Sequence, residues 1–424
     1  MNIQLPFGRE QLEVNIKKDK KVTIIENGID SYNRVKNEQE LIEEALEHPV
    51  RSDKLSVLAQ GCNNVVIITS DQTRPVPSRL IIPLLVREIY KGNSNAKISL
   101  LIATGCHRAP SKDELVKKFG EKILQEIPVF IHNCDAEDLI DCGFLQSGNH
   151  LYVNKLAYDA DLLISEGVIE PHFFAGYSGG RKSILPGIAG RSSIKFNHSA
   201  KSINEKNCTT GILEKNIIHQ EMQEAAEKIK LKFILNVMLN SKKEVVYAVA
   251  GDCKLAHQKG VEWLEGICKK DAVLSDVVLV TNNGYPLDQN IYQTVKGIST
   301  AAKTCRKNGV IIMVAACEDG VGGDAFGNLL KEDKSIQEIM QEILNTDCEN
   351  TRDDQWQVQI LLKILLDYHV ILVSKCSHTI VRDMRFLPCD SVQEALEQAE
   401  NILEKSDYTI TVIPEGVSTI INTY

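Results

Sequence analysis

The chain has 424 residues, of which 43% are hydrophobic and 25% charged, and its 48 Lys and Arg against 57 Asp and Glu give a net charge of −9. This length suggests about two or three domains, and the ordinary composition excludes a disordered, fibrous or membrane-spanning chain. The acidic balance argues against a general nucleic-acid binder, because such proteins carry a basic surplus. The negative net charge does not exclude a small anionic ligand, because a binding pocket needs only a few local cations.

The twelve cysteines are scattered along the chain and include no Cys-x-x-Cys pair, which excludes the zinc-ribbon and thioredoxin-type patterns. Many lie in apolar runs, as Cys317 does, where a free thiol packs as a small hydrophobic group. The opening residues lack the charged and apolar segments of a secretion signal. We therefore expect a cytoplasmic protein without a membrane segment.

Short β-branched runs alternate with amphipathic helical stretches, a pattern typical of βαβ units and mainly parallel sheets. The opening segment 11–25 alternates like a hairpin. Helices are expected at 79–90, with Pro77 near the start, and after Ser111, which forms a capping-box pattern with Glu114. The predicted strands are 65–69, 98–103, 129–131, 162–164, 233–239, 277–280, 310–315, 370–373 and 409–413.

The polar stretch 266–275, just before a new strand, predicts a domain boundary near residue 270. We expect an α/β protein of two domains, 1–270 and 271–424, each a mainly parallel sheet flanked by helices; the run 408–424 fits either. Ligands of such folds bind beyond the carboxyl ends of the strands. The unusual polar clusters directly follow predicted strands, at 70–74, 104–107, 165–167 and 282–285. The active site is therefore expected in the interdomain cleft.

The segment 166–190 is rich in glycine and contains the adjacent pair Arg181 and Lys182. A phosphate-binding P-loop does not fit, because its lysine must follow a glycine and here follows Arg181. A glycine-rich loop that only packs would leave two adjacent cations unexplained. The segment is therefore a candidate ligand-binding loop.

Three histidines fall in the strand-end loops, namely His107, His172 and His198. Histidine titrates near neutral pH, so two of them could act as an opposed acid and base. Imidazole also ligates nickel, copper and zinc. The wide spacing excludes a His-Glu-x-x-His helix and a zinc finger, and it leaves open which histidine is ligand and which is base.

Other polar residues could bind a carboxylate. Tyr292, Gln293 and Lys296 share one face of an expected helix, where the alternative is a solvated surface. Asp71 and Arg74 form a comparable pair, and an arginine can hold a carboxylate with two hydrogen bonds. Trp356 follows two aspartates, and core packing is its alternative role.

Together these motifs closely resemble the nickel-dependent lactate racemase family. They keep the family's order over residues 70 to 356, and the stretch from His172 to Ser183 is the most specific of them. The matching segments are 70–78, 103–108, 166–190, 197–199, 284–297 and 354–356.

The resemblance implies a nickel pincer nucleotide, the pyridinium-3-thioamide-5-thiocarboxylic acid mononucleotide of nickel, as cofactor. It would be attached covalently to Lys182 through a thioamide, with His198 as the protein's nickel ligand and with Asp71 and Arg74 in the same cofactor site. His107 and His172 would be the catalytic acid/base pair. The substrate would be bound by Arg74, Tyr292, Gln293, Lys296 and Trp356, so that the second domain completes a site carried by the first.

The implied reaction interconverts the D and L enantiomers of a 2-hydroxy acid, first of all lactate, by reversible hydride transfer. Cofactor maturation enzymes would be partners. Cys106 departs from the family, where a bulkier aromatic residue is expected, and Tyr177 adds a hydroxyl near the lysine loop. These changes keep malate, 2-hydroxybutyrate and phenyllactate open as substrates. A nickel-independent nucleotide- or phosphate-binding enzyme and a non-catalytic hydroxy-acid binder are the alternatives.

Overall fold

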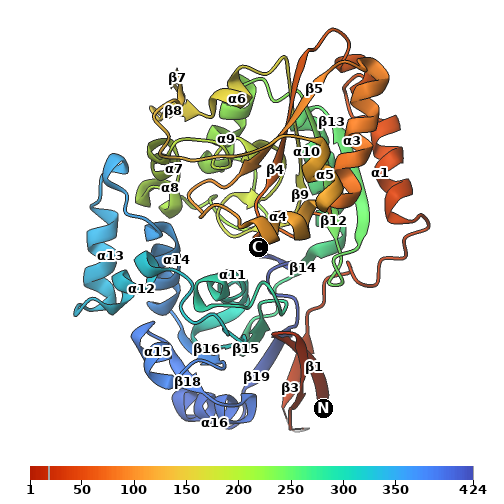
Figure 1. Ribbon diagram of the computed structural model, residues 1–424. Helices are drawn as coiled ribbons and strands as arrows, with labels where there is room; N and C mark the ends of the chain where they lie inside the picture. Colours follow the sequence, from red (N-terminus) through yellow and green to blue (C-terminus); the bar gives the residue numbers. More distant parts are fainter. Residues whose placement is uncertain (18–19, 424) are drawn as a thin grey trace.

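The computed structural model describes residues 1–17 and 20–423. Two six-stranded sheets, each covered by helices on both faces, form two domains that lie one above the other in Figure 1. All nine predicted strands are present, although β9 and β16 are longer than predicted. The predicted two-domain α/β fold with mainly parallel sheets is therefore confirmed.

The first sheet has the strand order β13-β12-β9-β4-β5-β6 and is parallel except for the antiparallel pair β12 and β13. Side chains of β4 alternate between two buried clusters: Val65 and Ile67 pack on one face, Val66 and Ile68 on the other. Burial on both faces explains why these strands are continuous apolar runs. Its strands are β4 (Asn64–Ser70), β5 (Lys97–Ala103), β6 (Val129–Ile131), β9 (Leu162–Val168), β12 (Phe233–Leu239) and β13 (Val245–Gly251).

The second sheet has the order β18-β17-β16-β15-β19-β3 and is parallel throughout. Its core follows the same alternation, with Val277 and Leu279 on one face and Val278 and Val280 on the other. Its strands are β3 (Lys21–Ile24), β15 (Ser275–Thr281), β16 (Cys305–Val314), β17 (His369–Val373), β18 (Leu387–Cys389) and β19 (Thr409–Ile413).

The helices cover these sheets and link their strands. The capping box of Ser111 and Glu114 is present at the start of α4, as predicted. In the first domain they are α1 (Glu38–Glu47), α2 (Leu55–Leu58), α3 (Ser78–Gly92), α4 (Lys112–Phe119), α5 (Glu121–Glu126), α6 (Lys155–Tyr158), η1 (Gly180–Ser183), α7 (Arg191–Asn197), α8 (Ala200–Asn204), α9 (Ile217–Lys228) and α10 (Cys253–Cys268). In the second they are α11 (Ile291–Ala302), α12 (Asp324–Lys331), α13 (Ile336–Leu344), η2 (Cys348–Asn350), α14 (Gln355–Leu365), α15 (His378–Asp383) and α16 (Val392–Leu403).

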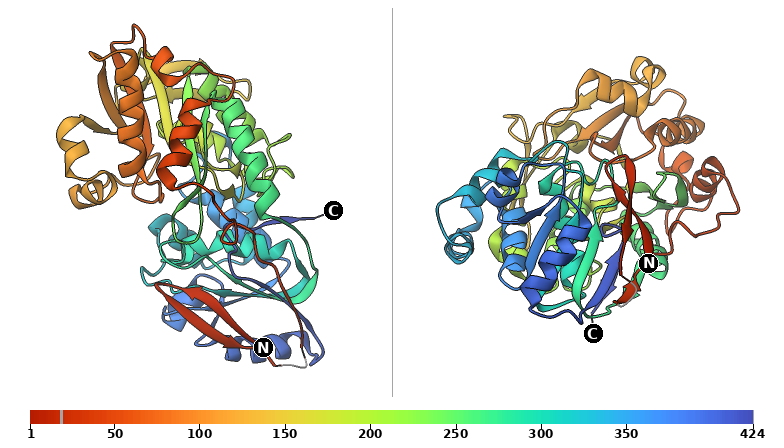
Figure 2. Two further views of the ribbon diagram at one scale, coloured as in Figure 1. Left: turned by 90° about the vertical axis from the view of Figure 1, so that its right-hand side faces the viewer. Right: turned by 90° about the horizontal axis from the view of Figure 1, so that it is seen from below.

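The opening segment differs from the expected hairpin at 11–25. The hairpin is formed instead by β1 (Asn2–Phe7) and β2 (Glu10–Asn15), and β3 joins the second sheet beside β19; residues 18 and 19 lie outside the described residues. Ile3 and Leu5 pack into the core of the second sheet, and Figure 2 shows this red segment against the blue domain. The first residues therefore lie with the second domain, although the predicted division at residue 270 assigns them to the first.

Three smaller strand pairs complete the fold. β7 (Ile140–Phe144) pairs with β8 (His150–Val153), and β10 (Pro171–His172) pairs with β11 (Gly176–Tyr177). β14 (Lys269–Asp271) pairs with β20 (Ile420–Asn422) between the two domains (Figure 1), where Ile420 packs into the first core and Ile421 into the second. Within the described residues, no helix is both long and apolar enough to cross a bilayer.

Candidate active site

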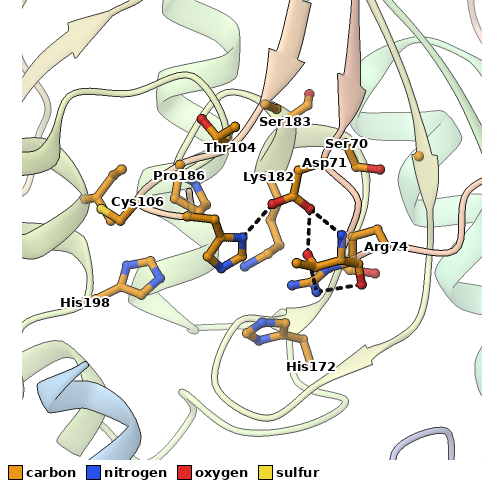
Figure 3. A pocket seen from close by; sticks show the side chains of 18 of the residues that line it. Ser70, Asp71, Arg74, Thr104, Cys106, His172, Lys182, Ser183, Pro186 and His198 are labelled. Carbon is orange, nitrogen blue, oxygen red and sulfur yellow. Dashed lines mark hydrogen bonds and ion pairs between the residues drawn. The ribbon is translucent and has the colours of Figure 1, made fainter. Parts of the chain in front are cut away.

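A cavity of about 430 Å³ lies between the domains, at the carboxyl ends of strands of the first sheet. Every site residue predicted from the sequence lines it. From the first domain come Asp71, Arg74, His107, His172, Lys182 and His198, and from the second come Tyr292, Gln293, Lys296 and Trp356 (Figure 3 shows several of them).

Asp71 and His107 follow neighbouring strands, β4 and β5, and meet at the cavity wall. Asp71 Oδ2 lies 2.7 Å from His107 Nδ1, and Asp71 Oδ1 accepts hydrogen bonds from the backbone and hydroxyl of Thr73. Burial alone would raise the pKa of Asp71, but the hydrogen bond and charge of His107, together with Arg74 and Thr73, lower it to about 2. Asp71 is therefore a buried anion that orients a half-exposed imidazole.

His172 lies on the short hairpin formed by β10 and β11 and is 9% exposed. Its Nδ1 accepts a hydrogen bond from the backbone N–H of Ala175 at 3.3 Å, so the proton of the neutral ring is on Nε2. Burial, and then the charges of Lys182, Lys296 and other neighbours, hold the pKa of His172 well below its usual value. The imidazole is therefore neutral near pH 7.

His198 directly follows helix α7 and is packed among aromatic rings. Its ring centroid lies 5.0 Å from that of Phe174 and 5.2 Å from that of Trp356, both edge-on. Its Nδ1 is buried without a hydrogen-bond partner. Burial, with the charge of Lys182, lowers the pKa of His198 to about 3, so this ring is neutral and offers a lone pair.

Lys182 lies in the 3₁₀ turn η1 and extends into the cavity (Figure 3). The turn depends on Gly179 and Gly180, which have φ of 77° and 52°, and the N–H of Gly180 donates to Asn236 Oδ1 at 2.9 Å. Among the described residues the Lys182 amine has no hydrogen bond or ion pair; its Nζ lies 5.5 Å from the centre of the Phe174 ring. Burial, with Arg181, Arg74 and Lys296, lowers its pKa well below the usual value.

Two neighbours of Lys182 do not face the cavity, contrary to their sequence-based interpretation. Arg181 is fully buried and donates to Ala175 O, Ser178 O, Gly179 O and His219 Nδ1, and its Nη1 lies 2.8 Å from His257 Nε2. Tyr177 is fully buried and its hydroxyl donates to Glu265 at 2.7 Å. Both side chains therefore support the loop from behind, because their polar atoms find partners in the protein interior.

Helix α11 supplies the residues of the second domain. Its N-cap Asn290 accepts from the backbone N–H of Gln293, and the predicted shared helix face does line the cavity. Gln293 Oε1 is buried without a partner. Burial and the charge of Arg74 lower the pKa of Lys296 to about 8. This helix therefore presents unpaired polar groups to the cavity.

The charges at the cavity favour an anion. Arg74, Lys182 and Lys296 form no ion pair with any described residue, and each lowers the pKa of its neighbours. Glu166 lies on the cavity wall, where burial raises its pKa despite hydrogen bonds from Thr69 and Ser78. A small carboxylate or phosphate would therefore find unpaired positive charge at Arg74 and Lys296, although the side chains of Asp71, Asp353 and Asp354 also line the cavity.

Sequence reasoning missed the contacts that cross the cleft. Asp353 of the second domain lies 3.0 Å from Lys195 and 3.5 Å from Arg191 on helix α7, and Arg191 also pairs with Asp135. Arg191 follows the glycine-rich segment directly and lines the cavity. The sequence could have indicated Arg191 as a cavity residue, because it directly follows Gly190 at the end of the glycine-rich segment.

Together the fold and this cavity define a two-domain α/β enzyme with a cationic cleft. Comparison with family models matches residues 7–211 to the lactate racemase N-terminal domain and residues 270–421 to the lactate racemase C-terminal domain. The chain belongs to the lactate racemase family, a family of isomerases.

Relatives and solved structures agree with this assignment. A lactate racemase of Thermoanaerobacterium thermosaccharolyticum is 44% identical over 422 residues, and one of Lactiplantibacillus plantarum is 41% identical over 421, each covering 99% of both chains. The structure of the lactate racemase apoprotein from T. thermosaccharolyticum matches with a TM-score of 0.96 over 100% of both chains at 44% identity. A Thermotoga maritima structure matches at 18% identity with a TM-score of 0.66, covering 93% of this chain and 100% of its own, and shares the fold alone.

Proposed function

We propose that this protein is a racemase of a 2-hydroxy acid, first of all lactate, that works by reversible hydride transfer. The observation that carries the proposal is that His107 and His172 open on one cavity which also holds the unpaired amine of Lys182. Two acid/base groups are what a reaction on both faces of one carbon requires. Relatives named lactate racemase, at 44% and 41% identity, support lactate as the substrate.

The residues fit a nickel pincer nucleotide attached at Lys182. An unpaired amine with a lowered pKa is nucleophilic, as attachment requires, and the orphaned Nδ1 of His198 is a free donor for nickel. Among the described residues, no three His, Cys, Asp or Glu side chains gather into a metal site. A nickel ion held by His198 would therefore take its other ligands from the bound nucleotide, whose covalent assembly would need maturation enzymes.

The two histidines would handle the hydroxyl proton. When bound, the pincer nucleotide supplies a centre that takes up a hydride and returns it, so the substrate avoids the dianion that loss of a proton beside its carboxylate would create. Asp71 keeps a proton on His107 Nδ1, which leaves Nε2 to accept the hydroxyl proton of one enantiomer. His172, whose Nδ1 accepts from Ala175, carries its proton on Nε2 and would supply a proton to the substrate oxygen on the other face.

The substrate carboxylate would be bound by Arg74 and Lys296, with Tyr292 and Gln293 as further polar contacts. Arg74 offers a planar fork suited to two parallel hydrogen bonds. Loss of hydride and of the hydroxyl proton would convert the 2-hydroxy acid into a planar 2-keto acid. Arg74 would hold the carboxylate of this keto acid while its carbonyl group rotates and presents the other face. Trp356 would close the wall beside His198.

Intact-mass measurement on protein co-produced with the maturation enzymes tests the cofactor assignment. We expect a covalent adduct with nickel in the wild type and in the exposed control Lys201→Arg, and none in Lys182→Arg. A noncovalent nucleotide without nickel would instead favour a phosphate-binding enzyme, and neither group would favour a non-catalytic binder.

Racemisation in D₂O tests the reaction itself. Hydride transfer predicts that L-lactate becomes D-lactate with protium retained at C2, whereas proton abstraction would introduce deuterium there. Exchange of C2 hydrogen with solvent at the rate of racemisation would exclude the hydride route.

Replacing either histidine tests the acid/base pair. We expect both His107→Gln and His172→Gln to lose turnover, because each direction of the reaction uses both groups.

Cys106 bears on the choice of substrate because it lines the cavity beside His107. A small side chain at this position leaves room for a larger acid than lactate. Parallel assays with lactate, malate, 2-hydroxybutyrate and phenyllactate measure the preference, and Cys106→Phe should reduce turnover of the larger acids first. An unchanged preference in Cys106→Phe would remove this role.

A further inference from the structure

Two cysteines lie side by side in the cavity wall. Cys106 follows strand β5 and Cys134 follows its parallel neighbour β6, so the turn after each strand brings the thiols to the same edge of the sheet. Their Sγ atoms are 4.0 Å apart. Cys106 lines the cavity, where small molecules reach it, and Cys134 is 6% exposed behind it.

The surroundings of this pair favour a thiolate. The hydrogen bond between the two thiols lowers the pKa of Cys134, as does the Arg191 guanidinium, although burial and the Asp135 carboxylate, 3.7 Å from Cys134 Sγ, oppose both. The same hydrogen bond and burial raise the pKa of Cys106. Arg191 is held in place by two hydrogen bonds to the Asp135 carboxylate, at 2.6 and 2.7 Å. The pair therefore combines Cys134, whose thiolate would accept a hydrogen bond from its partner, with Cys106, the thiol that lines the cavity.

We propose that Cys106 and Cys134 form a peroxide-sensitive dithiol that closes to a disulfide at the edge of the active site. The thiolate attacks one oxygen of a hydroperoxide, giving a sulfenic acid and releasing water or an alcohol. The second thiol then attacks the sulfenic sulfur, forming the S–S bond and releasing water. Two thiols are oxidised by two electrons and one peroxide O–O bond is reduced.

Closure of this disulfide acts on His107. An S–S bond of about 2.05 Å requires the sulfurs to approach from 4.0 Å, and Cys106 precedes His107 directly in the chain. The turn that carries them is held by His107 N–H to Thr104 O at 2.9 Å and by Gly105 N–H to Gly187 O at 3.0 Å, and Gly105 has φ of 54°. A shift of Cys106 in so tight a turn changes the position of the His107 imidazole against Asp71.

The experiment uses the full-length protein without cofactor, so it does not depend on racemase activity. The protein is treated with hydrogen peroxide, alkylated, digested and analysed by mass spectrometry before and after a phosphine reductant. We expect one reducible cross-link joining Cys106 and Cys134, absent in Cys106→Ser and in Cys134→Ser and retained in the control Cys142→Ser. Alkylation of both thiols after oxidation, or a cross-link between another pair, would overturn the proposal.

A second measurement tests the effect on His107. Histidine side-chain NMR signals of the same protein are compared before and after oxidation, with the His107 signal identified by its loss in His107→Gln. The proposal expects this signal to shift in the wild type and in Cys142→Ser and to stay unchanged in Cys134→Ser. A cross-link that leaves the His107 signal in place would contradict the link between the disulfide and the active site.

Discussion

Nδ1 of His107 lies 2.7 Å from Oδ2 of Asp71, and the two residues come from the ends of neighbouring parallel strands. The Asp71 side chain is 3% exposed, whereas the His107 side chain is 51% exposed. One partner is therefore fixed in the wall and the other reaches into the cleft. This contact aligns the imidazole and selects its tautomer before any substrate arrives.

Replacing Asp71 by Asn should preserve the shape of this contact and lose its charge. An amide that donates its N–H to Nδ1 would favour the tautomer with the proton on Nε2, which cannot accept the hydroxyl proton. We expect kcat to fall by about 10²–10⁴-fold, the range seen for general acid/base groups and their orienting carboxylates. Steady-state assays on the cofactor-loaded enzyme measure this.

A second His–Asp pair provides the matched control. His150 Nε2 lies 2.6 Å from Asp141 Oδ1 on the β7–β8 hairpin, and neither residue lines the cavity. Asp141→Asn should leave kcat within about twofold, because an exposed pair of this kind contributes little free energy. Equal losses in the two variants would mean that Asp71 acts through folding alone.

Replacing Arg181 by Lys should destabilise the protein while leaving a cation in place. Arg181 donates hydrogen bonds to three backbone carbonyls and to His219 Nδ1, at 2.9 to 3.3 Å, and none of these acceptors is charged. Lysine has fewer donors and no fork, so at least two buried acceptors lose a partner. At about 1–3 kcal/mol each, the loss of two partners should lower the free energy of unfolding by about 2–6 kcal/mol.

Urea denaturation of the cofactor-free protein measures this loss. The control Arg87→Lys removes an arginine that pairs with Glu43 on the surface, at 3.0 Å, and should cost less than about 1 kcal/mol. A similar small effect for Arg181→Lys would show that the neutral cage around Arg181 does not depend on the guanidinium.

Much of the site could be predicted because parallel strands end at one edge of their sheet. Once β4, β5 and β9 were recognised as apolar runs, the residues that follow them had to meet, and Asp71 and His107 do. Helical periodicity likewise predicted that Tyr292 and Lys296 share a face, which the cavity confirms. The sequence pattern was sufficient for these residues, because their positions depend on the strand or helix to which they belong.

The rest depended on contacts between distant segments. Strand β3 pairs with β19, nearly four hundred residues later in the chain, and nothing in Lys21–Ile24 indicates that partner. Arg181 was interpreted as a ligand group beside Lys182, but it donates instead to His219 on helix α9 and to the backbone carbonyl of Ala175. Whether a polar side chain faces a cavity or the interior is decided by partners that local sequence does not reveal.

Asp353 should contribute modestly to closing the cleft. It joins the second domain to Lys195 and Arg191 of the first, and its side chain is 50% exposed. Exposed ion pairs contribute about 0.2–1 kcal/mol and weaken with salt. Asp353→Asn should therefore raise KM about two- to fivefold at low ionic strength, and the difference should shrink in about 0.5 M salt.

The control Asp367→Asn breaks a comparable pair, with Lys307 at 3.2 Å, that lies within the second domain. It should leave KM unchanged. Lys195→Met should reproduce the effect of Asp353→Asn, and the double variant should add little to either. Additive effects in the double variant would mean that the two residues act separately and not as a pair across the cleft.

Buried neutral histidines should make the protein sensitive to mild acid. Burial, together with Arg181 and Lys254, lowers the pKa of His219 to about 3, whereas an unfolded histidine titrates near 6.5. Between these values the unfolded chain binds more protons, so stability falls as the pH falls. From pH 7.5 to 5.5 each such histidine should remove about 1.4 kcal/mol from the free energy of unfolding.

The variant His219→Gln tests this prediction, because glutamine keeps an acceptor for Arg181 and does not titrate. Urea denaturation at each pH measures the free energy of unfolding. Between pH 7.5 and 5.5 the variant should lose about 1.4 kcal/mol less than the wild type. Identical pH dependence in both proteins would mean that His219 has the same pKa in the native and unfolded states.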